Sequence, residues 1–204
     1  QLPPDYPDGF IFPKGPAGAN TAAYMDRGWC FFEAMVSSFS RLVLDLSKFT
    51  GGHDKLEDMI DACEAYRPAP VPPAAFYKAL KKKRFTSGNA DCAIVAGLYK
   101  HGIANFLSSA LELRLSFLHW TDSDVGALVR TLSVIGAPYV RILHLRYNTL
   151  SKASITSLTK CVRHGHLPCC IEIDLTGSIR ISDDDHSTTR ALRDLSNAVP
   201  SVLY

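Results

Sequence analysis

Residues 140–150 have the sequence VRILHLRYNTL, and this stretch decides how the chain folds. Leu143 and Leu145 are apolar and alternate with His144 and Arg146, which is the two-residue period of a strand with one buried face. An apolar stripe with the spacing i, i+3, i+7, typical of one helix face, follows at Ile155, Leu158 and Val162. The segment therefore predicts one unit made of a strand, a turn, a helix and a loop.

The same pattern returns every thirty residues. Leu113 corresponds to Leu143, then to Ile173 and then to Leu203. Further positions share this offset: Leu115, Leu145 and Leu175; Val125, Leu128 and Leu132 with Ile155, Leu158 and Val162; Pro138 with Pro168. A fixed period of about 20–50 residues is typical of stacked repeats that bury a shared core. We therefore expect parallel strands near Leu113, Leu143 and Ile173, adjacent and in that order.

The unit resembles the leucine-rich repeat consensus L-x-x-L-x-L-x-x-N-x-L. The matching residues are Val140, Leu143, Leu145, Asn148 and Leu150. The resemblance, to units of the ribonuclease-inhibitor kind, covers about Asn89 to Tyr204 and implies a short α/β solenoid in which parallel strands alternate with helices. It also implies that the Asn148 side chain bonds to the backbone at the bend. Leu118 and Ser178 stand in the asparagine place of the neighbouring units, and coincidental spacing in an ordinary α/β domain is the alternative.

We predict three parts of the chain. Residues 1–20 form an irregular Pro/Gly-rich arm, residues 21–72 a helical N-terminal segment and linker, and residues 73–204 the leucine-rich-repeat-like α/β domain. The second part includes a short helix over 55–66. In the third part, a helix over 89–101 with Ile94, Val95 and Leu98 on its apolar side is the cap or a degenerate first unit. The chain begins with Gln rather than Met, so a fragment and a processed product are both open.

Composition and charge argue against several classes of function. A formal net charge of +2 gives no bulk electrostatic case for nucleic acid or an anionic membrane. No run approaches the ~18 apolar residues of a transmembrane helix. We expect no cofactor, because the sequence contains no P-loop, no G-x-S-x-G and no dinucleotide-binding fingerprint. The six cysteines lack the spacing of a disulfide framework, which predicts a reducing, intracellular compartment without resolving cytoplasm from organelle.

One short segment points to an enzyme instead. Trp29 to Glu33, WCFFE, is similar to the W-C-x-x-E stretch of Toll/interleukin-1 receptor (TIR) domains. In the TIR domains that cleave NAD, the glutamate of this stretch is catalytic. The resemblance therefore implies a catalytic role for Glu33. However, the preceding residues predict coil rather than the strands that would build a nucleotide crevice. The alternative is an ordinary core stripe, with an ion pair between Arg27 and Glu33; its apolar members are Trp29, Phe32, Val36 and Phe39. We therefore expect no catalytic residue.

A second short cluster has the spacing of a metal site. Cys161, His164, His166 and Cys169 lie close together in the sequence, as zinc ligands often do. The thirty-residue register places Cys161 at the end of a helix and Cys169 beside a strand. We therefore predict no metal site.

The strand residues that point away from the core are the main functional candidates. They form three columns: Glu112, Ile142 and Glu172; Arg114, His144 and Asp174; Ser116, Arg146 and Thr176, with Phe117 and Tyr147 alongside. Arg and aromatic side chains dominate the hot spots of protein interfaces, and mixed charge argues against nucleic acid. We predict a non-catalytic interaction module or accessory subunit of a larger assembly, whose protein partner contacts Arg114, His144, Arg146, Tyr147, Glu172 and Asp174. A solvated strand face is the alternative.

Overall fold

The computed structural model describes residues 22–37, 39, 49, 51–52, 55–56, 59, 67–86, 90–179 and 186–204. The predicted arm at 1–20 and most of the predicted helix over 55–66 lie outside the described residues. The described part is an α/β fold in which a parallel sheet alternates with helices.

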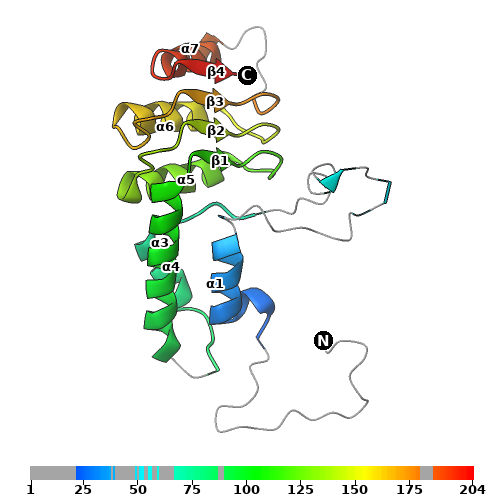
Figure 1. Ribbon diagram of the computed structural model, residues 1–204, viewed down its shortest axis with the longest axis vertical. Helices are drawn as coiled ribbons and strands as arrows, with labels where there is room; N and C mark the ends of the chain where they lie inside the picture. The colour runs from blue at the N-terminus through cyan, green and yellow to red at the C-terminus, as the bar shows by residue number, and fades with distance from the viewer. Residues whose placement is uncertain are drawn as a thin grey trace.

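The sheet contains four short parallel strands in sequence order, β1 (Glu112–Arg114), β2 (Ile142–His144), β3 (Glu172–Asp174) and β4 (Ser201–Leu203) (Figure 1). Helices α5 (Asp122–Ile135), α6 (Lys152–Arg163) and α7 (His186–Ser196) connect them. Leu113 pairs with Leu143, and Leu143 pairs with Ile173. The prediction of adjacent parallel strands at these three positions is confirmed.

The thirty-residue offset ends before the last strand. Ile173 pairs with Val202, whereas Leu203 pairs with Asp174. The predicted equivalence of Ile173 and Leu203 is therefore wrong by one residue, because the connection from β3 to β4 is one residue shorter than the two before it. Since neighbouring strand residues face opposite sides, Leu203 is 45% exposed.

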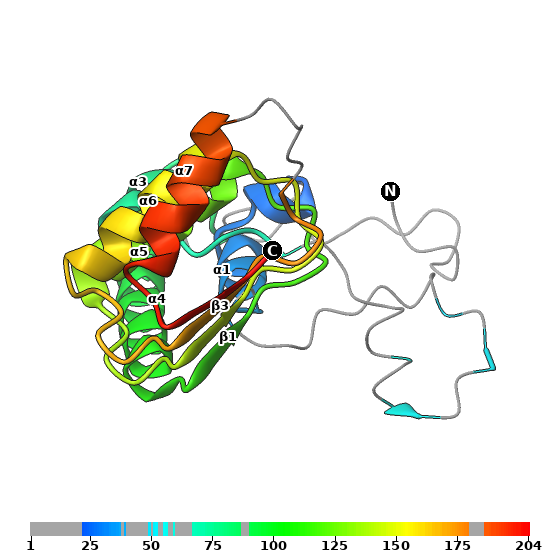
Figure 2. The ribbon, with the colours of Figure 1, turned by 90° about the horizontal axis from the view of Figure 1, so that it is seen from above.

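Helices α5, α6 and α7 lie side by side on one side of the strands (Figure 2). The core between the two layers contains Leu128, Leu158 and Leu195 from the helices and Leu143 and Ile173 from the strands, all at most 1% exposed. Burying one such side chain contributes about 1.5–3 kcal/mol. The apolar period of the sequence therefore places these elements correctly.

A carboxylate ties successive helices together. Asp122, in the first turn of α5, accepts hydrogen bonds from the Ser151 backbone N–H (2.9 Å) and hydroxyl (2.6 Å) and from the Ser154 hydroxyl at the start of α6. Partial burial works to raise the pKa of Asp122, but the bonds from Ser151 and Ser154 outweigh it and hold the pKa below its usual value.

The N-terminal helices form a separate packing arrangement. They are the 3₁₀ turn η1 (Tyr24–Asp26), α1 (Gly28–Ser37), α3 (Pro73–Leu80) and α4 (Ala90–Ser109). α1 and α3 pack on α4, which crosses the direction of α5 and leads into β1 (Figure 1). Val95 is buried as predicted, but Ile94 and Leu98 are 59% and 47% exposed, because α4 turns a different face to α1 and α3 than a stacked unit would.

The segment 67–71 closes the β1 side of the sheet. The Trp120 indole donates to the Arg67 carbonyl (2.8 Å), and the Arg67 guanidinium donates to the Arg114 carbonyl (3.2 Å). The Thr131 hydroxyl on α5 donates to the Pro70 carbonyl (2.8 Å). Among the helices of the described ranges, none combines enough length and apolar character to cross a membrane.

Candidate functional site

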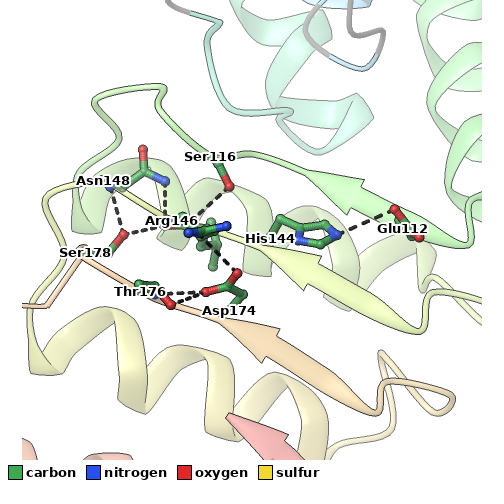
Figure 3. A network of polar contacts seen from close by, with 9 residues as sticks. Glu112, Ser116, His144, Arg146, Asn148, Asp174, Thr176 and Ser178 are labelled. Carbon is green, nitrogen blue, oxygen red and sulfur yellow. Dashed lines mark hydrogen bonds and ion pairs between the residues drawn. The ribbon is translucent and has the colours of Figure 1, made fainter. Parts of the chain in front are cut away.

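The strand register assembles the predicted columns on one face of the sheet. Glu112 lies opposite Ile142, which lies opposite Glu172, and Arg114, His144 and Asp174 form the next row. Figure 3 shows polar side chains of β1, β2 and β3 directed toward one another across this face. The sequence therefore predicted correctly which residues the fold brings together.

At the start of the strands, the Glu112 carboxylate lies beside two basic side chains. Glu112 lies 3.0 Å from the Arg114 guanidinium and 3.6 Å from the His144 Nε2 (Figure 3). Partial burial works to raise the pKa of Glu112, but the hydrogen bond and charge of Arg114, followed by those of His144, hold it below its usual value. The negative charge of Glu112 therefore largely cancels the positive charge beside it.

A second ion pair lies further along the strands. The Arg146 Nε is 3.4 Å from an Asp174 carboxylate oxygen. The other Asp174 oxygen accepts from the Thr176 backbone N–H (3.0 Å) and hydroxyl (2.6 Å). The Asp174 side chain is only 8% exposed. Its ion pair positions the Arg146 guanidinium, which stays exposed, and a direct contact of Asp174 with a partner stays a prediction.

Beneath the turns, Asn148 bonds two successive loops together. Its Oδ1 accepts from the backbone N–H groups of Leu118 (3.2 Å) and Trp120 (3.0 Å), and its Nδ2 donates to the carbonyls of Leu115 (2.8 Å) and Leu145 (2.9 Å). The asparagine thus satisfies four buried backbone groups, as expected for the bend.

The next loop continues this arrangement with a shorter side chain. The Ser178 hydroxyl accepts from the Asn148 backbone N–H (2.8 Å) and donates to the Leu145 carbonyl. Ser178 and Asn148 are both buried. The turns after β1, β2 and β3 are therefore held in fixed relative positions by a continuous set of buried hydrogen bonds.

Two exposed aromatic residues stand on these fixed turns. Phe117 and Tyr147 occupy equivalent positions thirty residues apart, and both have left-handed backbone φ angles, 59° and 52°. Their rings stack with centroids 4.7 Å apart, and the Arg146 guanidinium lies 5.6 Å from the Tyr147 ring centroid. Phe117 is 50% exposed and Tyr147 is 47% exposed. We call Phe117, Arg146 and Tyr147 the aromatic ridge.

Gly177 stands at the third equivalent position, thirty residues after Tyr147, and leaves room for the Tyr147 ring. Gly177 also has a left-handed φ, 69°, and a Cβ there would lie 2.7 Å from the Tyr147 ring. Glycine adopts this conformation without strain and leaves room for the ring. Tyr147 is therefore packed between Phe117 and the Gly177 backbone, which fixes its orientation.

The enzyme-like segment lies outside this surface. Glu33 is exposed and accepts a hydrogen bond from the Tyr24 hydroxyl (3.2 Å), while Arg27 donates to the Ala22 carbonyl rather than pairing with Glu33. Trp29, expected in the core stripe, is 41% exposed, and its indole donates to Asp91 (2.9 Å). The predicted ion pair between Arg27 and Glu33 is wrong, because these side chains bond to Ala22 and Tyr24 instead. The predicted burial of Trp29 is also wrong, because its indole bonds to Asp91 at the start of α4.

The Cys/His cluster is dispersed by the fold. Cys161 is buried in the helical layer, where burial raises the pKa of its thiol to about 12. Cys169 is exposed in the following loop. Within the described ranges, no group of three or more His, Cys, Asp or Glu side chains has the arrangement of a metal site.

The sequence matches no known protein-family model and no curated protein. The functional case therefore rests on the geometry of the surface. Sequence reasoning identified its charged columns but missed the left-handed turns and the stacking of Phe117 on Tyr147. The available signal was Gly177, which marks in the third unit a backbone conformation that the first two units share.

Proposed function

We propose that this chain is a non-catalytic protein-interaction module, or an accessory subunit of a larger assembly, and that the aromatic ridge and the adjoining strand face contact its partner. The observation that carries this proposal is the conformation of Phe117 and Tyr147. Both are half-exposed aromatic residues with left-handed backbones. Such residues cost of order 1 kcal/mol or more each and concentrate at binding and catalytic sites.

The chemistry of the ridge favours a protein over other partners. Tyr and Phe provide large contact areas with few rotatable bonds to immobilise, and Arg adds a planar charged group. Tyr and Arg are enriched in hot spots, and aromatic residues and Arg are enriched in interface cores. The ion pairs of Glu112 with Arg114 and of Arg146 with Asp174 leave little net positive field on this face. A nucleic acid would find neither a basic track nor free stacking platforms in a groove.

We further propose that residues 89–204 are leucine-rich-repeat-like units that stack as a short solenoid. The strand pairing at an offset of thirty residues and the backbone bonds of Asn148 support this proposal. The shorter step to β4 departs from the pattern. Free thiols at the described cysteines, which include Cys161, Cys169 and Cys170, are compatible with a reducing compartment.

A TIR-like NAD hydrolase is not favoured by any feature of the described residues. The Glu33 carboxylate is exposed on α1, which packs on η1 and α4 rather than on the sheet. We expect the purified chain to leave NAD intact in a chromatographic assay. Consumption of NAD that disappears in Glu33→Ala would instead make the chain an enzyme.

The interaction proposal is tested by removing the ridge. Arg146→Ala combined with Tyr147→Ala should weaken binding to the native partner by about 2 kcal/mol or more, which is typical of a central hot spot. The melting temperature should change little, because both side chains are about half-exposed and the Asp174 carboxylate keeps its two hydrogen bonds from Thr176. The readout is quantitative recovery of co-purifying proteins from the native source.

A matched control lies at the other end of β2. Tyr139→Ala combined with Arg141→Ala removes the same two residue types from exposed positions outside the ridge. The control should retain the partner. Equal recovery by the ridge variant, the control and the wild type would place the contacts elsewhere.

A further inference from the structure

A groove of about 570 Å³ lies between α6 and α7. The helices that form it lie on the side of the strands opposite the exposed strand face (Figure 2). Lys152, Lys160 and Arg163 line it from α6, and Arg190 and His186 line it from α7. Asp194 is the single acidic residue in its lining. The groove is therefore strongly basic in a chain whose formal net charge is only +2.

The cations of the groove are not neutralised. Lys152, Lys160 and Arg190 are exposed and form no ion pair with any described residue, and the Arg163 guanidinium donates only to the Asp194 backbone carbonyl (3.4 Å). On the strand face, by contrast, Arg114, His144 and Arg146 each have a carboxylate partner. Unpaired cations collected in one concavity attract anions and raise their local concentration.

The spacing of these cations selects an extended anion. Lys152 and Arg163 stand at opposite ends of α6. At a rise of about 1.5 Å per residue they are separated by roughly 16 Å along the helix axis. One compact anion, such as a phosphate group, cannot contact both. A polypeptide carrying several carboxylates can, because alternate side chains of an extended segment recur about every 7 Å.

The remaining lining distinguishes a peptide from a nucleic acid. Apart from the His186 imidazole, the groove contains no aromatic ring on which a base could stack. Its walls include Thr156, Thr159 and Ala191, together with the aliphatic stems of the lysines. Such stems pack well against the methylene groups of Glu side chains.

We propose that the groove between α6 and α7 binds an acidic segment of a protein partner, rich in Asp or Glu. Lys160 and Arg190 stand on the two walls and contact its carboxylates. Asp183, Asp184 and Asp185 precede α7 in the sequence and lie outside the described residues. The groove and the aromatic ridge are on different faces, so either can fail without the other.

The test is a titration of the full chain with a fluorescein-labelled oligoglutamate peptide, followed by fluorescence anisotropy at low and at physiological salt. Lys160→Glu combined with Arg190→Glu should weaken binding at least ~10-fold. The wild-type affinity should fall as salt rises, because the contacts are ionic and exposed. Circular dichroism should show both proteins folded.

The matched control reverses two exposed cations outside the groove, Lys100→Glu and Arg130→Glu, with the same change in net charge. The control should bind the peptide within about twofold of the wild type. Equal weakening in both variants would show a response to net charge alone and overturn the site. Tighter, groove-dependent binding of an oligouridine RNA would also overturn it in favour of a nucleic acid, and so would the absence of peptide binding.

Discussion

The two faces of the sheet-containing part differ in whether their charged side chains form ion pairs. On the strand face, Arg114 and His144 share Glu112, and Arg146 is held by Asp174. On the helical face, Lys160 and Arg190 stand in a groove and form no ion pair with any residue that the structure describes. Paired charges produce a rigid surface with a weak field, whereas unpaired charges produce a field that acts at a distance.

This difference predicts different roles for the two faces in binding. Shape and hot-spot side chains determine specificity at close range, while unbalanced charge accelerates association and responds to salt. Phe117 and Tyr147 add oriented contact area to the strand face. We infer that the strand face selects the partner and that the helical face attracts an acidic segment.

The largest effect is expected where the strand face is held together from beneath. Asn148→Ala removes four hydrogen bonds to buried backbone groups and leaves those groups without partners. Each unsatisfied buried group costs about 1–3 kcal/mol, and partial relaxation limits the total to roughly 3 kcal/mol. Urea unfolding measures the loss. The exposed neighbour Thr149→Ala should change the free energy of unfolding by less than about 0.5 kcal/mol.

A smaller loss is expected at the base of the aromatic ridge. Gly177→Ala places a Cβ 2.7 Å from the Tyr147 ring at a left-handed φ, and should cost about 2 kcal/mol. Gly165→Ala is the control, because its φ is 75° but a Cβ there would meet open space. That variant should cost about 1 kcal/mol, from backbone strain alone. Only Gly177→Ala should also displace Tyr147 and weaken partner binding while peptide binding in the groove persists.

The helical layer should show an acid-dependent contribution from Asp122. Its folded pKa is lowered, so its stabilising effect is complete above the unfolded value of about 3.9 and disappears as pH falls through the folded pKa. Asp122→Ala should cost about 1 kcal/mol at pH 7 through loss of the bonds to Ser151 and Ser154. Unfolding curves of the variant and the wild type should converge as the pH falls below the lowered folded pKa of Asp122. A difference independent of pH would mean that packing, not charge, is responsible.

The smallest effect on stability is expected in the groove. Unpaired cations repel one another, so Lys160→Glu with Arg190→Glu should leave the fold unchanged or raise its stability by up to about 0.5 kcal/mol at low salt. Added salt should reduce that gain, because it screens the repulsion in the wild type. A marked loss of stability, measured by thermal unfolding, would mean that these cations have structural partners.

The apolar period predicted the strands and helices of the repeating part because burial of Leu113, Leu143 and Ile173 follows directly from alternation. It did not predict the step to β4, where one residue fewer in a connection shifts Leu203 out of register. Alternation also fails at Asp174, whose burial depends on Arg146 above it. Tertiary partners of this kind leave no periodic signal.

The geometry of the two proposed binding surfaces was predicted only in part for the same reason. Side-chain type identified Arg146 and Tyr147, but their orientation depends on a left-handed turn that sequence indicates only through Gly177. The groove arises from α6 and α7 packing side by side. Lys160 and Arg190 are thirty residues apart, and their unpaired state depends on which acids the fold places nearby.

The most direct test of the central claim compares partner recovery by two variants from the native source. Arg146→Ala with Tyr147→Ala should lose the partner at every salt concentration, because the ridge supplies contact area. Lys160→Glu with Arg190→Glu should lose it mainly at low salt and approach the wild type at high salt, where screening removes the electrostatic contribution. Full recovery by the ridge variant, with both proteins folded, would contradict the assignment of the strand face as the partner-binding surface.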